Sequence, residues 1–328
     1  MRLTGLFYTA LAGQMAATVP VLADDLADGA QIAAAFVAGD TDQIWAAATP
    51  DMQQAFGSAK DLAAWRTSLG TEFGTEEEVI DEQTAESGGF TVYSRVARWS
   101  DTPDPMEIVI SLDEGQKIAG FVMRPQPVAA NSAQMDYETQ ANLRLPFDGP
   151  WFVYWGGRDI ADNYHAADPV QRFAMDFLVQ QDGQSYAGDA SILANYYCWG
   201  QPILAPANGT VVAAEGGWPD QPIGETDPVN PLGNHVVIDM GNGEFVFLAH
   251  LQQDSLTVSE GDTISARQQV GRCGNSGNST EPHLHMHMQN DPTFGQGEGL
   301  PAQFNRYTAD GETGLQGEVR KGQTVQQD

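Results

Sequence analysis

Lysine is scarce in this chain of 328 residues, which has it only at Lys60, Lys117 and Lys321. Lysine and arginine together number 15 against 44 acidic residues, so the formal net charge is −29 at pH 7. An acidic surface of this size repels phosphate groups, and the composition therefore excludes nucleic acid as a partner. Long apolar runs are also lacking beyond the first twenty or so residues, which argues against a transmembrane segment in the rest of the chain.

The first residues are the exception to this polar composition. Arg2 is followed by an apolar run rich in small residues, and Val21-Leu22-Ala23 precedes two aspartates. This pattern predicts a signal peptide over residues 1–23, cleaved after Ala23. The alternative, an N-terminal membrane anchor, is disfavoured because Gln14 interrupts the apolar run. We therefore expect an exported protein, in the periplasm or outside the cell, with no transmembrane segment after the leader is removed.

Cysteine is nearly absent as well, since Cys198 and Cys273 are the only two. An even number of cysteines in an exported chain favours a disulfide between them. Two buried free thiols are an alternative. Zinc ligation by both is a weaker one, because they do not form a close CxxC pair.

Residues 24–126 alternate between helical and extended patterns, which predicts a small α+β domain. Helical periodicity with capping residues appears in ADGAQIAAAFVAG, DTDQIWAAA and SAKDLAAWRTSLG. The period then changes to two in FTVYSRVARW, MEIVISLD and KIAGFVMR, which predicts three strands. Helices followed by this strand pattern resemble the small cone-shaped NTF2-like domains that precede some exported hydrolases. That resemblance implies a binding or spacing role.

The second half of the chain shows short strand patterns separated by turn signals, with little helical periodicity. Candidate strands are AMDFLV, TVVAA, HVVID and EFVFLAHL, and Gly241-Asn242-Gly243 is a turn signal between the last two. This spacing predicts a mainly antiparallel β domain. A polar linker is expected before it and a polar, poorly ordered tail after it. The expected segments are 24–126, 127–145, 146–306 and 307–328.

All six histidines lie in this second half, three of them in the stretch HLHMH. Because side chains alternate along a strand, His283, His285 and His287 should share one face while Leu284 and Met286 enter the core. A solvated strand face is the ordinary alternative. Three histidines at period two favour a metal or catalytic site.

Two further residues stand out near that stretch. Asp176 lies within the apolar strand pattern AMDFLV, where a carboxylate is costly unless it is paired or bound to a cation. His165 precedes it in a loop, and His250 ends the strand EFVFLAHL. Catalytic zinc usually takes three ligands from histidine and carboxylate, and these residues supply the right types.

The stretches NYHAADPVQRFAMDF, PILAPANGTVVAA, GNHVVIDMGNGEFVFLAHL and VGRCGNSGNSTEPHLHMHM together resemble the M23 metallopeptidases, the lysostaphin- and LytM-like zinc endopeptidases of bacterial cell walls. The resemblance implies a compact antiparallel β fold with one Zn²⁺ per chain. It implies zinc ligation by His165, Asp176 and His285, and catalytic roles for His250 and His283.

One spacing departs from the family pattern, because ten residues separate His165 from Asp176 where the common motif has three. His235 and His287 are therefore rival ligands. His235 begins a strand and reads as an exposed residue. Since two residues along a strand span about 6.8 Å, three neighbouring histidines cannot all reach one ion, and His287 is expected to be an outer or surface residue.

These features predict an exported zinc metalloendopeptidase, a monomer, that hydrolyses peptide bonds in peptidoglycan stem or cross-bridge peptides. A secreted endopeptidase acting on glycine-containing proteins outside the wall is one alternative. A non-catalytic binding or amidase-activating module of the same family is another. It is disfavoured because all five positions that the resemblance requires are filled. A purely structural zinc site would normally have four protein ligands and more cysteine.

Overall fold

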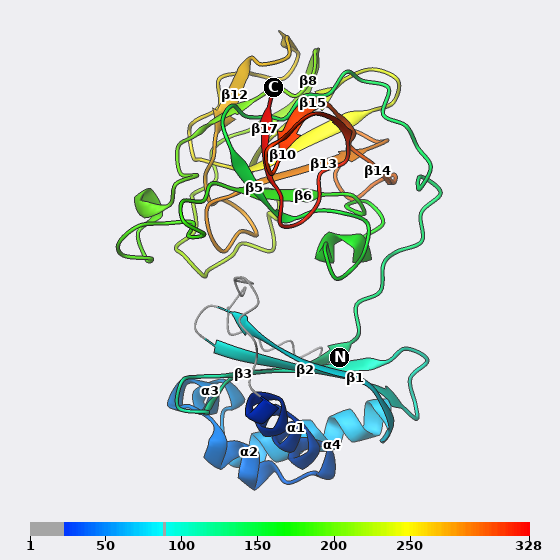
Figure 1. Ribbon diagram of the computed structural model, residues 1–328, viewed down its shortest axis with the longest axis vertical. Coiled ribbons are helices and arrows are strands. Elements are labelled where there is room, and N and C mark those ends of the chain that lie inside the picture. The colour runs from blue at the N-terminus through cyan, green and yellow to red at the C-terminus, as the bar shows by residue number, and fades with distance from the viewer. Residues whose placement is uncertain (1–22, 88–89) are drawn as a thin grey trace. The chain divides into compact units, whose positions relative to one another are not determined.

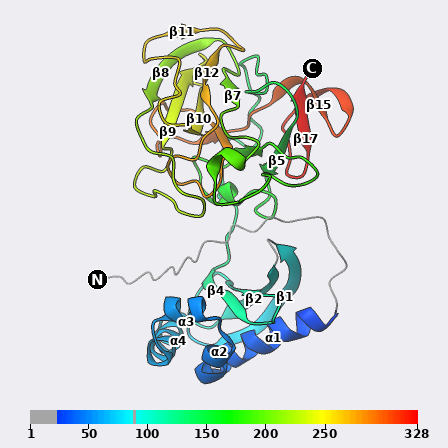
Figure 2. The same ribbon diagram turned by 90° about the vertical axis from the view of Figure 1, so that its left-hand side faces the viewer.

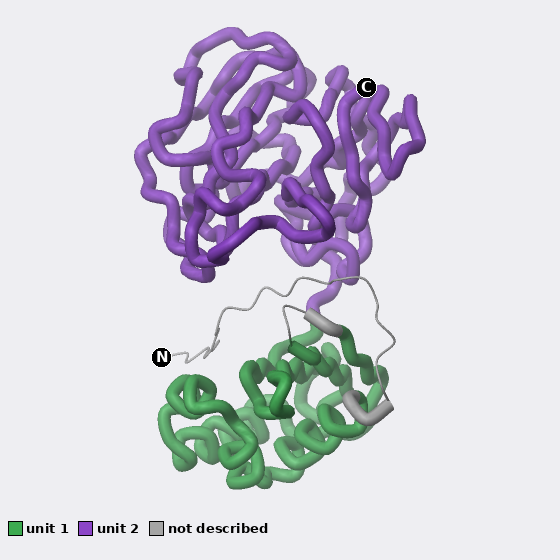
Figure 3. Tube along the Cα trace, turned by 60° about the vertical axis from the view of Figure 1, so that its left-hand side comes forward, with its two compact units in different colours: residues 1–126 green, residues 127–328 purple. Residues whose placement is uncertain are grey.

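The computed structural model describes residues 23–87 and 90–328. The chain forms two compact units, Met1–Gln126 and Pro127–Asp328 (Figure 3). The predicted signal peptide, residues 1–23, lies outside the described residues except for Ala23. No helix within the described ranges is long and apolar enough to span a membrane.

The described part of unit 1 starts with four helices whose ends follow from local capping. Asp40 accepts a hydrogen bond from the Gln43 backbone at 3.2 Å, and Ser58 does the same for Asp61, as N-cap residues do. Gly74 ends the last helix with φ of 80°, a conformation that favours glycine. The helices are α1 (Ala23–Ala38), α2 (Thr41–Ala47), α3 (Pro50–Phe56) and α4 (Ala59–Phe73).

The helices of unit 1 cover one face of a four-stranded antiparallel sheet of order β1-β2-β3-β4 (Figures 1 and 2). Phe36, Leu62, Ile110 and Phe121 are buried between the two layers. The predicted α+β class and three of the strands are confirmed, whereas the acidic strand β1 was not foreseen. The likeness to NTF2-like domains stays a prediction. The strands are β1 (Glu76–Ser87), β2 (Phe90–Trp99), β3 (Met106–Leu112) and β4 (Ile118–Pro125).

Unit 2 is mainly antiparallel β, as its sequence predicts. Its large sheet has the order β11-β8-β9-β10-β13-β6-β5-β17-β15-β16, with β14 paired to β13. A separate pair, β7 and β12, packs over the core. The elements are β5 (Trp151–Trp155), η1 (Tyr164–Ala167), β6 (Met175–Leu178), η2 (Leu193–Asn195), β7 (Pro202–Leu204), β8 (Gly209–Glu215), β9 (Asn234–Asp239), β10 (Phe245–Leu251), β11 (Thr263–Ile264), β12 (Gln269–Arg272), β13 (Leu284–Gln289), β14 (Gly299–Leu300), β15 (Phe304–Ala309), β16 (Glu312–Gly317) and β17 (Thr324–Gln327).

The core of unit 2 lies on one face of the central strands β9, β10 and β13. Leu284, Met286 and Met288 of β13 all enter it and are at most 1% exposed. Leu143 and Leu145, in the segment expected to be a linker, are buried in the same core. The alternation predicted for the HLHMH stretch therefore holds, and it leaves the opposite face of β13 to the histidines.

The C-terminal residues 307–328 differ from the expectation of a poorly ordered tail. They complete β15 and form β16 and β17, and β17 lies inside the large sheet, where it pairs with β5 on one side and β15 on the other. Tyr307, Val319 and Val325 are buried. The expectation was wrong because these apolar residues are few and widely spaced, so their burial depends on tertiary contacts and not on a local pattern.

Candidate metal centre and active site

Strands β6 and β13 place the candidate metal ligands opposite each other. They are antiparallel neighbours in which His285 is the partner of Asp176. Both side chains are buried, and His285 Nδ1 lies 2.9 Å from Asp176 Oδ1. Residues directly opposite in such a pair point to the same face, so the sheet register alone brings these two groups together.

His165 reaches the same point from the short 3₁₀ turn η1. Asn163 Oδ1 accepts hydrogen bonds from the His165 backbone N–H at 3.2 Å and from its Nδ1 at 2.9 Å. The Asn163 amide is itself held by the carbonyls of Gly157 and Ala174, both at 2.9 Å. His165 Nε2 is thereby left 3.6 Å from Asp176 Oδ2. The ten-residue spacing between the two residues is thus no obstacle to their meeting.

The three residues His165, Asp176 and His285 fit a zinc ion. One ligand atom from each lies within 4.8 Å of the other two, and all three residues are buried. Tetrahedral zinc with bonds of roughly 2.0–2.1 Å holds its ligand atoms about 3.3 Å apart. In the structure His285 Nδ1 lies 2.9 Å from Asp176 Oδ1 and His165 Nε2 lies 3.6 Å from Asp176 Oδ2, so both histidines stand near that separation from the carboxylate. Two histidines and one carboxylate make three protein ligands. A fourth position is then left for water or substrate, which is the arrangement of catalytic zinc.

The electrostatics of this cluster also favour a bound cation. Burial raises the pKa of Asp176 to about 6 and lowers the pKa of His285 to about 4. Burial likewise holds the pKa of His165 well below its usual value. The imidazoles are therefore neutral at pH 7 and do not neutralise the carboxylate. A buried carboxylate among neutral imidazoles is stabilised by a metal cation placed between them.

Two further imidazoles direct their Nε2 atoms toward the same region. His283 Nδ1 lies 2.9 Å from the Glu281 carbonyl, and His250 Nδ1 lies 2.9 Å from the Ser276 carbonyl. Because a carbonyl oxygen only accepts, each Nδ1 carries the proton and each Nε2 keeps a lone pair. His283 Nε2 is 3.7 Å from Asp176 Oδ1, and the two imidazole rings are 4.7 Å apart between centroids.

The backbone at His250 is unusual. Its φ is 60°, and the pairing of β10 with β9 shifts register between Leu248 and Leu251. A left-handed conformation in a residue other than glycine is held in place by its surroundings and is frequent at functional sites. Here the His250 N–H donates to the Leu232 carbonyl at 3.0 Å. This register shift, a β-bulge, turns the His250 side chain away from the face that a regular strand would give it.

A cleft of about 320 Å³ opens beside these residues, with His165, His250 and His285 on its surface. Tyr164 and Asp168 lie on its lining, as do Leu232 and Phe294 from other parts of the chain. The lining is therefore mixed, with a carboxylate and an aromatic hydroxyl as well as apolar groups. An extended peptide has both kinds of surface to contact in such a cleft.

The two rival histidines are placed differently. His235 is half-buried at the start of β9, with its Nδ1 2.8 Å from the Gly233 carbonyl, and it is not in the cluster. His287 is fully buried, and its Nδ1 is 3.0 Å from His285 Nε2. The possibility that His287 is a surface residue is therefore wrong. Sequence reasoning also missed two residues that contact these histidines. Asn163 hydrogen-bonds His165, and Gln289 Oε1 lies 3.1 Å from His287 Nε2. Both contacts depend on the fold, and no sequence motif indicates them.

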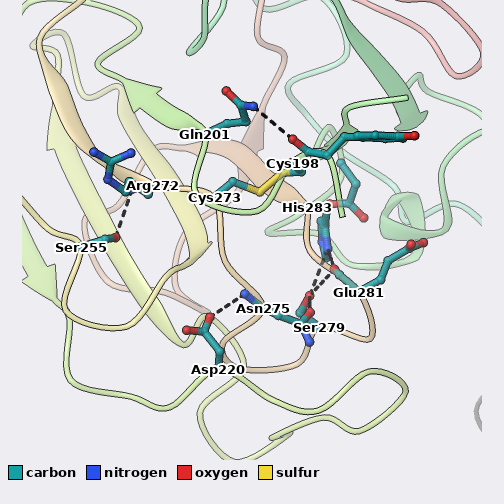
Figure 4. The surroundings of a disulfide bond; sticks show 12 residues. Cys198, Gln201, Asp220, Ser255, Arg272, Cys273, Asn275, Ser279, Glu281 and His283 are labelled. Carbon is teal, nitrogen blue, oxygen red and sulfur yellow. Dashed lines mark hydrogen bonds and ion pairs between the residues drawn. A yellow bond between two sulfur atoms is a disulfide. The ribbon is translucent and has the colours of Figure 1, made fainter. Parts of the chain in front are cut away.

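The cysteines form the predicted disulfide, which joins the segment after η2 to the end of β12 (Figure 4). Cys273 pairs with Leu251, the neighbour of His250. The next residue, Gly274, bridges to His283 and donates to the His250 carbonyl at 3.1 Å. The bond thus anchors the backbone on which both candidate catalytic histidines depend.

Removing this disulfide is expected to destabilise the folded chain. Cys198 and Cys273 are 75 residues apart, and closing a loop of that size stabilises by about 4 kcal/mol in the chain-entropy model. In the double variant Cys198→Ala/Cys273→Ala, the free energy of unfolding should therefore be lower than in the parent by about 4 kcal/mol, as measured by urea denaturation. Two free thiols in the natively exported, denatured parent would contradict the expectation, since no bond would then be present to lose.

A model of a known protein family matches part of the second unit. Residues 194–296 match the family model described as "Peptidase family M23". This confirms the resemblance stated from the sequence, and the matched part contains His250, His283 and His285, whereas His165 and Asp176 precede it.

Individual relatives are similar over limited parts of the chain. The peptidoglycan DD-endopeptidase ShyA of Vibrio cholerae is 37% identical over 90 residues, which cover 26% of this chain and 20% of that protein. The chain therefore spans about a fifth of the length of this relative. The catalytic domain of the prophage-encoded M23 protein EnpA from Enterococcus faecalis is 20% identical, with a TM-score of 0.31 over 48% of this chain and 93% of that one. The catalytic domain of lysostaphin from Staphylococcus simulans is also 20% identical, with a TM-score of 0.28 over 45% of this chain and 86% of that one.

Proposed function

We propose that the protein is an exported zinc metalloendopeptidase acting on peptidoglycan stem or cross-bridge peptides, because residues 194–296 match the model of peptidase family M23. The observation that carries this proposal is the convergence of His165, Asp176 and His285 within 4.8 Å, beside two imidazoles with free Nε2 atoms. The substrate class is taken from the relative ShyA, a peptidoglycan DD-endopeptidase.

His165 Nε2, the Asp176 carboxylate and His285 Nδ1 would hold the zinc ion. When bound, zinc supplies a Lewis acid that polarises a carbonyl oxygen and lowers the pKa of a water toward neutrality. The three ligands contribute one negative charge, so a bound Zn²⁺ would give the site a net positive charge that stabilises a developing oxyanion. The cleft beside them would hold the peptide chain on either side of the scissile bond.

His283 is the proposed general base. Its Nδ1–H is fixed by the Glu281 carbonyl, so its Nε2 lone pair stays directed at the site and accepts a proton from the attacking water. Once protonated, the same Nε2 can deliver that proton to the leaving amine.

His250 has the same tautomer, set by the Ser276 carbonyl. Burial holds its pKa well below the usual histidine value, so it stays neutral at pH 7. A neutral imidazole with its lone pair toward the site accepts a hydrogen bond from the attacking water and helps to orient it. We therefore assign proton transfer to His283, which is less buried, and positioning of the water to His250.

Two other functions use the same fold. A non-catalytic binding or amidase-activating module would not need five correctly oriented ligand and base groups, and their presence supports an enzyme. An endopeptidase acting on glycine-containing proteins outside the wall would share the site and differ in substrate. Unit 1 contains no histidine, and we propose for it a binding or spacing role apart from the chemistry.

A peptidoglycan digest tests the proposal. The protein without residues 1–23 is incubated with purified peptidoglycan, with zinc or after treatment with a chelator, and the released fragments are identified by mass spectrometry. We expect peptides cut at one type of bond, with cutting lost on chelation and restored by zinc. Binding to peptidoglycan without release of fragments would favour the non-catalytic module. Cleavage of glycine-rich proteins alone would favour the other substrate class.

A further inference from the structure

The side chain of Gln289, at the end of β13, is fixed in one orientation by the loop that follows it. It is fully buried, and its Nε2 lies 2.5 Å from the Asp291 carbonyl, 2.8 Å from that of Thr293 and 3.3 Å from that of Gln296. Carbonyl oxygens only accept hydrogen bonds, so the amide nitrogen must face them. The amide oxygen of Gln289 therefore faces the other way, toward the imidazole of His287.

That oxygen determines which nitrogen of His287 carries the proton. Gln289 Oε1 lies 3.1 Å from His287 Nε2, and because the amide oxygen only accepts, Nε2 must be the protonated nitrogen. His287 is fully buried, its ring stacks on Phe247 at 4.5 Å between centroids, and its two ring nitrogens contact an amide oxygen and an imidazole, neither of which compensates a buried positive charge. A neutral imidazole has one N–H, so His287 Nδ1 is an acceptor.

The same logic passes to the candidate ligand. His287 Nδ1 lies 3.0 Å from His285 Nε2, which must then donate its proton, and His285 Nδ1 is left with a lone pair 2.9 Å from Asp176 Oδ1. Two acceptors at that distance repel each other unless a cation lies between them. With the opposite tautomer, His285 Nδ1 would donate its proton to Asp176, and a metal would have to displace that proton.

We propose that His287 and Gln289 are positioning residues that fix the tautomer of His285, so that its Nδ1 is available to the metal. This inference rests on the proposed zinc site. Metal-bound histidines commonly donate their second N–H to a carboxylate, a carbonyl or water. Here the acceptor is a neutral imidazole, shielded from water and oriented by a buried amide, so the tautomer is set without a second charge near the ion.

Zinc affinity of two matched variants tests the proposal. His287→Phe keeps an aromatic ring against Phe247 but removes the acceptor. His287→Asn places an amide oxygen close to the position of Nδ1 and preserves it. We expect His287→Phe to weaken zinc binding by about 10–100-fold, in competition with a chromogenic chelator, and His287→Asn to stay close to the parent. Thermal unfolding of both metal-free variants is the control, because a merely structural role would change stability and leave the affinity of the folded protein unchanged.

A second measurement needs no variant. Two-dimensional ¹⁵N NMR of the parent with labelled histidine should show His287 protonated on Nε2 and His285 protonated on Nε2. Protonation of His287 on Nδ1 would overturn the proposal, as would parent-like zinc affinity in His287→Phe or equal losses in both variants. Should the parent itself fail to bind zinc, the proposed function fails, whereas a His287→Phe variant that binds zinc as tightly as the parent refutes only the role of His287 and Gln289.

Discussion

Replacing His285 by alanine is expected to abolish zinc binding and peptide cleavage together. His285 Nδ1 is one of three ligand atoms, and its loss leaves Asp176 and His165, too few to hold the ion against a chelator. Asp176→Asn should have the same result, because it removes the only negative charge among the ligands while keeping the shape of the side chain. Zinc content by atomic absorption and cleavage of purified peptidoglycan are measured on the same samples.

His235→Ala is the matched control for these losses. His235 is also a histidine of unit 2, but it hydrogen-bonds the Gly233 carbonyl and is not in the cluster. Its replacement should leave both zinc content and cleavage near the parent values. A folded His285→Ala protein that keeps stoichiometric zinc would show that the ligand set is wrong.

Replacing His283 by alanine should separate metal binding from catalysis. His283 is outside the three-ligand cluster, so zinc content should remain near one per chain. Turnover should fall by roughly 10²–10⁴, the usual effect of losing a general base. The decisive comparison sets kcat on a short peptide substrate beside zinc content for each variant. His283→Ala should lose kcat and keep zinc, whereas His285→Ala should lose both.

The variant His250→Ala provides a further contrast in the same assay. It should also keep zinc. Its loss of turnover should be smaller than that of His283→Ala, because His250 positions the attacking water and does not transfer the proton. Loss of zinc from His283→Ala with retention in His285→Ala would mean that ligand and base are exchanged. Equal turnover in His283→Ala and the parent would remove His283 from the mechanism.

The features that the sequence predicted well are those set by strand periodicity and register. The alternation in HLHMH places Leu284 and Met286 in the core and the histidines on the opposite face, because a strand has no other way to arrange them. A buried carboxylate at Asp176 requires a partner, and the sheet supplies one in His285. The five histidine and aspartate positions named from sequence all lie at this one site.

Other features depend on contacts that have no local signal. The outward turn of His250 requires a register shift between β10 and β9, and nothing in EFVFLAHL indicates it. Gln289 looks like an ordinary polar residue at a strand end, yet three carbonyls of the following loop orient it. The strands β15–β17 were missed because their buried residues are sparse and gain their partners only from distant strands such as β5. In each case tertiary contacts decide the conformation.

The central claim is that His165, Asp176 and His285 bind one zinc ion, and anomalous X-ray diffraction at the zinc edge tests it most directly. Crystals of the zinc-loaded protein should show one strong anomalous peak per chain. It should lie about 2.0–2.2 Å from His165 Nε2, from a carboxylate oxygen of Asp176 and from His285 Nδ1, with His283 and His250 beyond bonding distance. A peak bound through His285 Nε2 or His287, or no peak at this cluster in protein that cleaves peptidoglycan, would contradict the claim.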